Sequence, residues 1–177
     1  ERYLEIWNLV FMQNMRGPGN GKNDFPIVGE LPNKSIDTGL GLDRIAAILQ
    51  GVDTVCQTDL LAPTLATVER LAGRPFPGRD GSDESVSFQV VAEHARSTAF
   101  LITDGVLPSN EGRGYVLRRL MRRAIRHARS LGIDGPMLAD VVTSVIDNLG
   151  QEWPELQTQR SLILAVVTRE EETFGAT

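Results

Sequence analysis

The chain has 177 residues, of which 41% are hydrophobic and 23% charged, and its formal net charge is −5. This length suits one domain or two small ones with a buried core, and the composition is typical of a globular protein. No run of about 18 apolar residues and no basic, hydrophobic leader is present, so we expect neither a membrane span nor an export signal. The single cysteine, Cys56, excludes an internal disulfide and fits a reducing, cytoplasmic compartment.

The net charge is an average over two unlike regions. Residues 96–129 hold eight arginines against Asp104 and Glu111, a net charge of +6, whereas the rest of the chain sums to −11. The overall negative charge therefore does not exclude a nucleic-acid partner, because the basic side chains are concentrated in one place.

The first 51 residues predict two strands and a helix. Residues 5–13 are rich in aromatic and branched side chains and are apolar on both faces, which predicts a buried strand. Glycines and prolines predict a loop over 14–34. A second strand through 35–37, a Gly-rich turn at 38–41 and a helix over 42–50 that ends at Gly51 follow.

The rest of the chain predicts helices. Helical spacing occurs over 59–72, 86–103, near 136–149 and over 155–174, a turn-rich connector spans 73–85, and a further helix follows Pro108 and ends at Gly132. The expected fold class is α+β. Because the chain does not begin with Met and both ends lie inside predicted elements, we expect it to be a piece of a longer protein.

The Gly-rich turn is the first candidate site. Gly39 and Gly41 lack Cβ and let backbone approach a ligand, and the following helix offers free N–H groups to a phosphate. Arg44, one turn into that helix, can reach a phosphate or stack on a base, and Asp37 can hold an ammonium group. The alternative is a structural turn in which Arg44 pairs with a nearby acid, such as Asp43 or Glu30.

The arginine-rich helix after Pro108 is the second candidate site. Apolar residues recur on one face, and arginines form a second stripe without Asp or Glu four residues away to relieve their repulsion. A stripe of this kind favours an anionic partner such as nucleic acid. The alternative is a solvated face that pairs with acids of neighbouring helices. The stripe consists of Arg118, Arg122, Arg126 and Arg129, and Arg119 and Arg123 lie beside it.

The segment 37–47 resembles motif 3 of class II aminoacyl-tRNA synthetases, and the segment 5–13 resembles the strand before that motif. Both segments are most similar to the alanyl-tRNA synthetase family. Asp43 stands where the class commonly has Glu. The resemblance implies the end of an antiparallel class II core over 1–55, a helix and connector over 56–85, and a truncated helical tRNA-recognition domain over 86–177. It also implies activation of L-alanine with ATP and transfer to tRNA(Ala), with ATP and Mg²⁺ as cofactors.

The resemblance assigns roles at the turn. ATP would be bound by Arg44, Gly41 and Gly39. Asp37 would hold the amino group of alanine and Asn8 its carboxylate. Gly39 would also leave room for the methyl group of alanine. No side chain is assigned as catalytic, because catalysis would rest on positioning and charge stabilisation, and no metal ligand is assigned. Since motifs 1 and 2 have no counterpart, we expect the chain alone to be inactive.

The segments 95–106 and 108–123 resemble the helical domain of the same family. There, Asn110 would read the G·U pair of the acceptor stem through its amide oxygen, and Arg118, Arg119, Arg122, Arg123 and Arg126 would bind phosphates. Capping of the helix by Asn110 is the alternative. A non-catalytic RNA-binding module and another ATP-dependent ligase with the same core are the alternative functions.

A few further residues receive structural expectations. Trp7 and Cys56 are expected to pack in the core, and Glu170 to Glu172 to form a solvated helix face. No Cys and His spacing fits zinc, so His94 and His127 are not expected to bind a metal.

Overall fold

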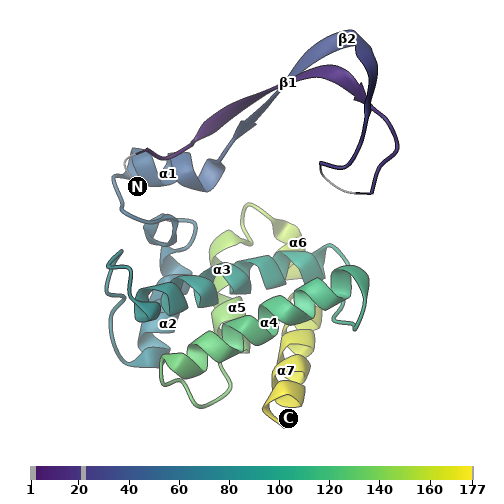
Figure 1. Ribbon diagram of the computed structural model, residues 1–177. Helices are drawn as coiled ribbons and strands as arrows, with labels where there is room; N and C mark the ends of the chain where they lie inside the picture. Colours follow the sequence, from purple (N-terminus) through teal and green to yellow (C-terminus); the bar gives the residue numbers. More distant parts are fainter. Residues whose placement is uncertain (1–2, 21–22, 177) are drawn as a thin grey trace. The chain divides into compact units, whose positions relative to one another are not determined.

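The computed structural model describes residues 3–20 and 23–176. By its contacts the chain divides into two compact units, Glu1–Ala46 and Ala47–Thr177. The described residues of the first unit hold a β-hairpin and the start of a helix, and those of the second are helical (Figure 1). The predicted α+β class is confirmed.

The hairpin pairs β1 (Trp7–Arg16) with β2 (Ile27–Leu40) in antiparallel fashion. Asn8 lies opposite Gly39 and Val10 opposite Asp37, and the register shifts after Met12 and again after Met15. β2 leads directly into α1 (Leu42–Gln50), which has the predicted bounds, and Gly51 follows with a φ of 66°. A positive φ at this position favours glycine as the residue that ends the helix.

Both strands are longer than predicted. The loop expected over 14–34 is confined to 17–26, of which residues 21–22 lie outside the described part, because 14–16 belong to β1 and 27–34 to β2. Pro32 suggested a loop, but each strand of a two-stranded hairpin is an edge strand, where a proline without an N–H donor is tolerated.

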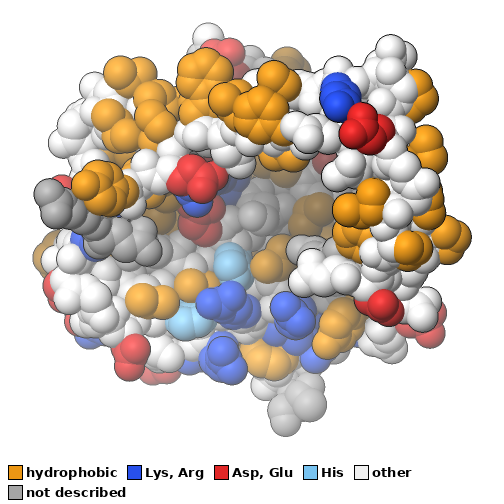
Figure 2. All heavy atoms as spheres, turned by 45° about the horizontal axis from the view of Figure 1, so that its top comes forward, with side chains coloured by type: hydrophobic (Ala, Val, Ile, Leu, Met, Phe, Trp, Pro, Cys, Tyr) orange, Lys and Arg blue, Asp and Glu red, His pale blue; other side chains and the backbone are white. Residues whose placement is uncertain are grey.

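The predicted burial of the first strand is wrong. Every residue of β1 is exposed, including Trp7 at 64% and Phe11 at 59%. The pattern of apolar residues on both faces is typical of a strand covered by further layers, whereas the unit that contains this hairpin supplies none among its described residues. Apolar side chains on the hairpin are visible in Figure 2.

The second unit is built from helices around one core. They are η1 (Val55–Gln57), α2 (Ala62–Ala72), α3 (Asp83–Thr103), α4 (Gly112–Ser130), α5 (Leu138–Leu149), α6 (Pro154–Thr158) and α7 (Arg160–Gly175). α3 and α4 pack side by side in antiparallel fashion, and α5 packs against α2, α3 and α7 (Figure 1). The helix predicted over 155–174 is divided at Gln159 into α6 and α7. Cys56 is fully buried, as expected.

The helix α4 follows the predicted amphipathic pattern. Leu117, Met121 and Ala124 are fully buried on one side. Exposed arginines lie on the other sides of the helix, together with the exposed Tyr115 and Val116. Near its start, a Cβ at Gly114 would collide with the Leu107 carbonyl and the Ser109 hydroxyl, so glycine permits the loop before α4 to lie against the helix. None of the helices in the described part of the chain has the length and apolar character that a bilayer-spanning helix requires.

Candidate functional site

The hairpin brings together the residues predicted to bind an amino acid. Asn8 and Gly39 are cross-strand partners, and Asp37 pairs with Val10 two residues along each strand. Because opposite residues share a face and side chains alternate along a strand, Asn8, Asp37 and Gly39 lie on one face of the hairpin. An amide and a carboxylate on one face can bind the two charged ends of a small zwitterion.

Gly39 leaves space that the Asn8 side chain needs. A Cβ built on Gly39 would lie 2.9 Å from Asn8 Oδ1, closer than ordinary contact distance. The Asn8 amide nitrogen donates to Glu5 Oε1 at 3.2 Å, which holds the side chain beside the glycine. The position of the amide therefore depends on the missing side chain opposite it.

Arg44 and Gly41 lie at the junction of β2 and α1. The Gly41 N–H donates to the Ile6 carbonyl at 2.9 Å, and Arg44 Nη1 donates to the Glu5 carbonyl at 2.6 Å. A Cβ on Gly41 would lie 3.3 Å from Arg44 Cδ, so the arginine packs over the glycine. Glu30, one alternative partner of Arg44, pairs instead with Lys34 at 3.0 Å. The exposed guanidinium keeps other donors for an anion.

A groove on the second unit is lined by arginines. Arg119, Arg122, Arg123 and Arg126 of α4 face it together with Phe174 of α7, and Arg122 lies over the Phe174 ring with 5.3 Å between Cζ and the centroid. Within residues 3–20 and 23–176, no acid pairs with Arg119, Arg123 or Arg126. We call this concave surface the arginine groove.

Two histidines beside the arginine groove are held in their neutral form. Burial, followed by the charges of Arg123 and His127, lowers the pKa of His94 to about 4. The pKa of His127 is lowered by burial and by Arg123 and Arg126, and its Nδ1 lies 2.9 Å from Ser87 Oγ. Figure 2 shows Lys and Arg side chains gathered beside the histidines. The positive charge of this surface at neutral pH therefore comes from arginine.

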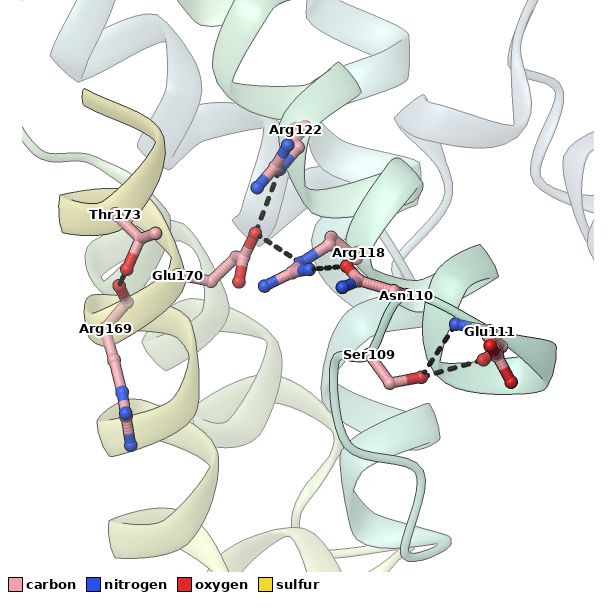
Figure 3. A network of polar contacts seen from close by, with 8 residues as sticks. All are labelled: Ser109, Asn110, Glu111, Arg118, Arg122, Arg169, Glu170 and Thr173. Atoms are coloured by element: carbon pink, nitrogen blue, oxygen red, sulfur yellow. Dashed lines mark hydrogen bonds and ion pairs between the residues drawn. The ribbon is translucent and has the colours of Figure 1, made fainter. Parts of the chain in front are cut away.

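Glu170 of α7 binds two of the predicted phosphate-binding arginines. Its Oε1 accepts from Arg118 Nε at 3.0 Å and from Arg122 Nε at 2.9 Å, and the residue is only 5% exposed (Figure 3). The alternative of pairing with an acid of a neighbouring helix thus holds for Arg118 and Arg122. The expected solvated face is wrong for Glu170 and Glu171, which are both buried.

Asn110 does not cap α4. The N-cap residue is Glu111, without a hydrogen bond from its side chain, and Ser109 Oγ donates to the Glu111 carbonyl at 2.7 Å. Asn110 Oδ1 instead accepts a hydrogen bond from Arg118 Nη1 (Figure 3). The amide oxygen expected to contact RNA is therefore already engaged, although a carbonyl oxygen can accept a second hydrogen bond.

Sequence reasoning missed Glu170 as a site residue. The apolar periodicity of α7 could have indicated its burial, because Ile163, Val167 and Phe174 share one face of the helix with Glu170. The acid thus continues the stripe that faces the core. A second groove beside the arginine groove is lined by Pro108, Arg118, Arg169 and Glu170. Arg169 was also not predicted as a site residue.

No metal site accompanies these residues. Within the described ranges, no group of three His, Cys, Asp or Glu side chains is arranged to hold a metal ion. Mg²⁺ that is bound together with ATP takes most of its ligands from phosphates and water and needs only one or two carboxylates, so the Mg²⁺ that the resemblance implies stays a prediction.

Comparison with known proteins adds the family. The family model described as tRNA synthetases class II (A) matches residues 1–177. The chain is 51% identical over 177 residues to an alanine–tRNA ligase of Mycobacterium sp. strain KMS, covering 100% of the chain and 20% of that relative. It is 50% identical over 177 residues to the one from Mycolicibacterium smegmatis, with the same coverage. With that from Corynebacterium diphtheriae it shares 50% over 173 residues, 98% of the chain and 19% of the relative. The chain spans about a fifth of their length.

Proposed function

This chain belongs to the class II (A) tRNA synthetase family, and on that premise we propose that it is a segment of an alanine–tRNA ligase. The whole protein would activate L-alanine with ATP, forming alanyl-adenylate and pyrophosphate, and would then transfer the alanyl group to the 3′ end of tRNA(Ala) with release of AMP. The observation that carries this proposal is the identity of about half of all positions with alanine–tRNA ligases along the whole chain.

The face of the hairpin that carries Asn8, Asp37 and Gly39 would hold alanine. A single methyl group contributes only about 0.8 kcal/mol by burial, so a site for alanine depends mainly on its charged ends. Asp37 would accept from the ammonium group, and Asn8 would donate to the carboxylate. The missing side chain at Gly39 makes room for the Asn8 amide on this face, which supports this assignment.

The junction of β2 and α1 would bind ATP. Arg44 and the N–H groups of the first turn of α1 offer positive charge and donors to phosphate, and Gly39 and Gly41 let the ligand approach the backbone. The reaction would depend on holding the alanine carboxylate against the α-phosphate of ATP, from which pyrophosphate leaves, with charge stabilisation by Arg44. No side chain needs to form a covalent intermediate.

The arginine groove and Asn110 would bind the acceptor stem of tRNA(Ala). Arg119, Arg123 and Arg126, together with Arg118 and Arg122, would contact phosphates, which gives affinity that falls steeply with salt but carries no sequence information. Asn110 would contact base edges in the wide minor groove of the A-form stem, at the G·U pair.

Two substitutions in the full-length protein test this division of labour. We expect Asp37→Ala to reduce alanine-dependent pyrophosphate exchange, because the ammonium group loses its partner. We expect Asn110→Ala to reduce tRNA charging by about tenfold or more while exchange persists, as for loss of one specific base contact. Asp24→Ala, which removes an exposed acid from the hairpin loop, is the control.

The outcomes separate the alternatives. Equal loss of exchange and charging in the Asn110 variant would contradict its role in RNA recognition. A full-length protein that binds acceptor-stem RNA but shows no exchange with any amino acid would be the non-catalytic RNA-binding module. Exchange with another amino acid only would identify a different ligase with the same core.

A further inference from the structure

We propose that Glu170 is a positioning residue that, through Arg118, fixes the orientation of the Asn110 amide toward the acceptor stem. The inference rests on the proposed function, in which Asn110 contacts the G·U pair. The inference gives a negatively charged residue of α7 an indirect role in recognising RNA, which is itself negatively charged.

One guanidinium connects the two residues. Arg118 Nε donates to Glu170 Oε1 at 3.0 Å, while Nη1 of the same group donates to Asn110 Oδ1 (Figure 3). Glu170 is 5% exposed, and the Arg118 side chain is 25% exposed. The planar guanidinium is rigid, so its orientation at Glu170 determines where its other nitrogen meets Asn110.

The chemistry of Arg118 decides which end of the Asn110 amide faces outward. A guanidinium has donors and no acceptor, so the atom that it contacts must be the amide oxygen. The amide nitrogen then points away from Arg118, and the second lone pair of the oxygen stays available to accept from the guanine amino group. Without Arg118 in place, the exposed amide could rotate and offer either end to the RNA.

The charge of Glu170 gives this arrangement a distinctive signature. Arg118, Arg122 and Glu170 together carry a net charge of +1, because a single carboxylate serves both arginines. Loss of the carboxylate would leave Arg118 and Arg122 without their shared acid and strengthen their attraction to phosphates. We therefore expect sequence-independent affinity to rise while discrimination falls, whereas simple unfolding would lower both.

The experiment measures charging of two acceptor-stem minihelices, one with G·U and one with G·C, by the full-length protein. In Glu170→Gln, the ratio of the two kcat/KM values should fall by about tenfold, as for loss of one specific base contact, and the affinity for the G·C minihelix at low salt should be equal or higher. Arg118→Lys keeps the positive charge but loses the rigid fork, and should lower the ratio similarly. Glu172→Gln, on the exposed side of α7, is the matched control and should keep the wild-type ratio.

The results distinguish this inference from the proposed function. If Asn110→Ala abolishes the preference for G·U but Glu170→Gln and Arg118→Lys retain it, the inference is wrong and the proposed function stands. If Glu170→Gln lowers the affinity for both minihelices in parallel, Glu170 is structural only and the inference is also wrong. If Asn110→Ala retains the preference, the role of Asn110 fails, and the positioning role of Glu170 fails with it.

Discussion

Gly39 is the residue at which one added carbon has the most direct consequence for the proposed alanine site. A Cβ there would lie 2.9 Å from Asn8 Oδ1, so Gly39→Ala must displace the amide that would donate to the alanine carboxylate. A hydrogen bond to a charged group contributes about 1.5–3 kcal/mol. We expect the KM for alanine in pyrophosphate exchange by the full-length protein to rise by about tenfold or more.

Gly29→Ala is the matched control for that prediction. Gly29 lies in the same strand, β2, but a Cβ there would meet nothing within 4 Å. Its KM for alanine should stay close to that of the wild type. Similar increases in both variants would mean that the substitutions disturb the strand, and that Gly39 makes no special space for Asn8.

His94 predicts a dependence of stability on pH. Its folded-state pKa of about 4 lies below the ordinary value of 6.5, so the unfolded chain binds more protons between these values. This contribution is fully present above about pH 6.5 and is lost as the pH falls toward 4. Because the imidazole is partly exposed, we expect a loss of only about 1 kcal/mol between pH 7 and pH 5.

Urea unfolding followed by the helical circular dichroism signal measures this effect. The unfolding free energy of the wild type should fall more between pH 7 and pH 5 than that of His94→Gln, which cannot titrate there. Identical pH dependence in the two proteins would show that His94 is protonated as readily in the folded state as in the unfolded chain.

The residues that could be predicted are those whose neighbours lie nearby in the sequence. Gly39, Gly41 and Arg44 form a local motif, and their junction with the start of β1 follows from pairing of two adjacent strands. Glu170 could not be predicted, because it lies 52 residues from Arg118. The run of three acids from Glu170 to Glu172 predicts a solvent-exposed face, and only the packing of α7 against α4 shows that Glu170 is buried.

At the scale of elements, periodicity predicted α4 well and the hairpin poorly. The apolar stripe of α4 is a property of the helix itself, and its partners α3, α5 and α7 lie within the chain. The burial of β1 depends on layers that its sequence cannot supply. The expected 14–34 loop was too long because proline is excluded from central strands but tolerated in edge strands, and both strands of a two-stranded hairpin are edge strands.

Glu171 couples two helices and predicts a loss of stability. Its carboxylate accepts from the Met137 N–H at 3.0 Å and from the Leu138 N–H at 3.0 Å, at the start of α5. Met137, the N-cap residue, makes no cap with its own side chain, so the acid of α7 replaces it. We expect Glu171→Ala to lower the unfolding free energy by about 2 kcal/mol, because two buried N–H groups lose a charged acceptor.

Chemical denaturation of Glu171→Ala and Glu172→Ala measures this coupling. Glu172 is the neighbouring acid on the exposed side of the same helix, so its removal should change the unfolding free energy by less than about 0.5 kcal/mol. Equal effects of the two substitutions would contradict a capping role for Glu171.

At the scale of the whole molecule, the two units bury their apolar side chains very differently. In the second unit, Phe88, Leu117, Met121 and Ile146 are fully buried in a core shared by its helices. In the first, the cross-strand partners Phe11 and Ile36 are 59% and 57% exposed. A hairpin without a covering layer is only marginally stable in water, and its apolar surface favours association.

We therefore expect residues 47–177 alone to unfold cooperatively and to stay monomeric, and residues 1–177 to self-associate through the hairpin. Replacing both Phe11 and Ile36 with threonine keeps β-forming side chains while removing apolar surface from one face, so it should reduce association of residues 1–177. Sedimentation velocity over a range of concentrations, with thermal unfolding of each protein, measures both effects. If residues 47–177 associate as strongly as residues 1–177, the surface responsible for association lies on the helical unit. We do not expect that result, because the exposed arginine side chains of the arginine groove repel those of a second copy.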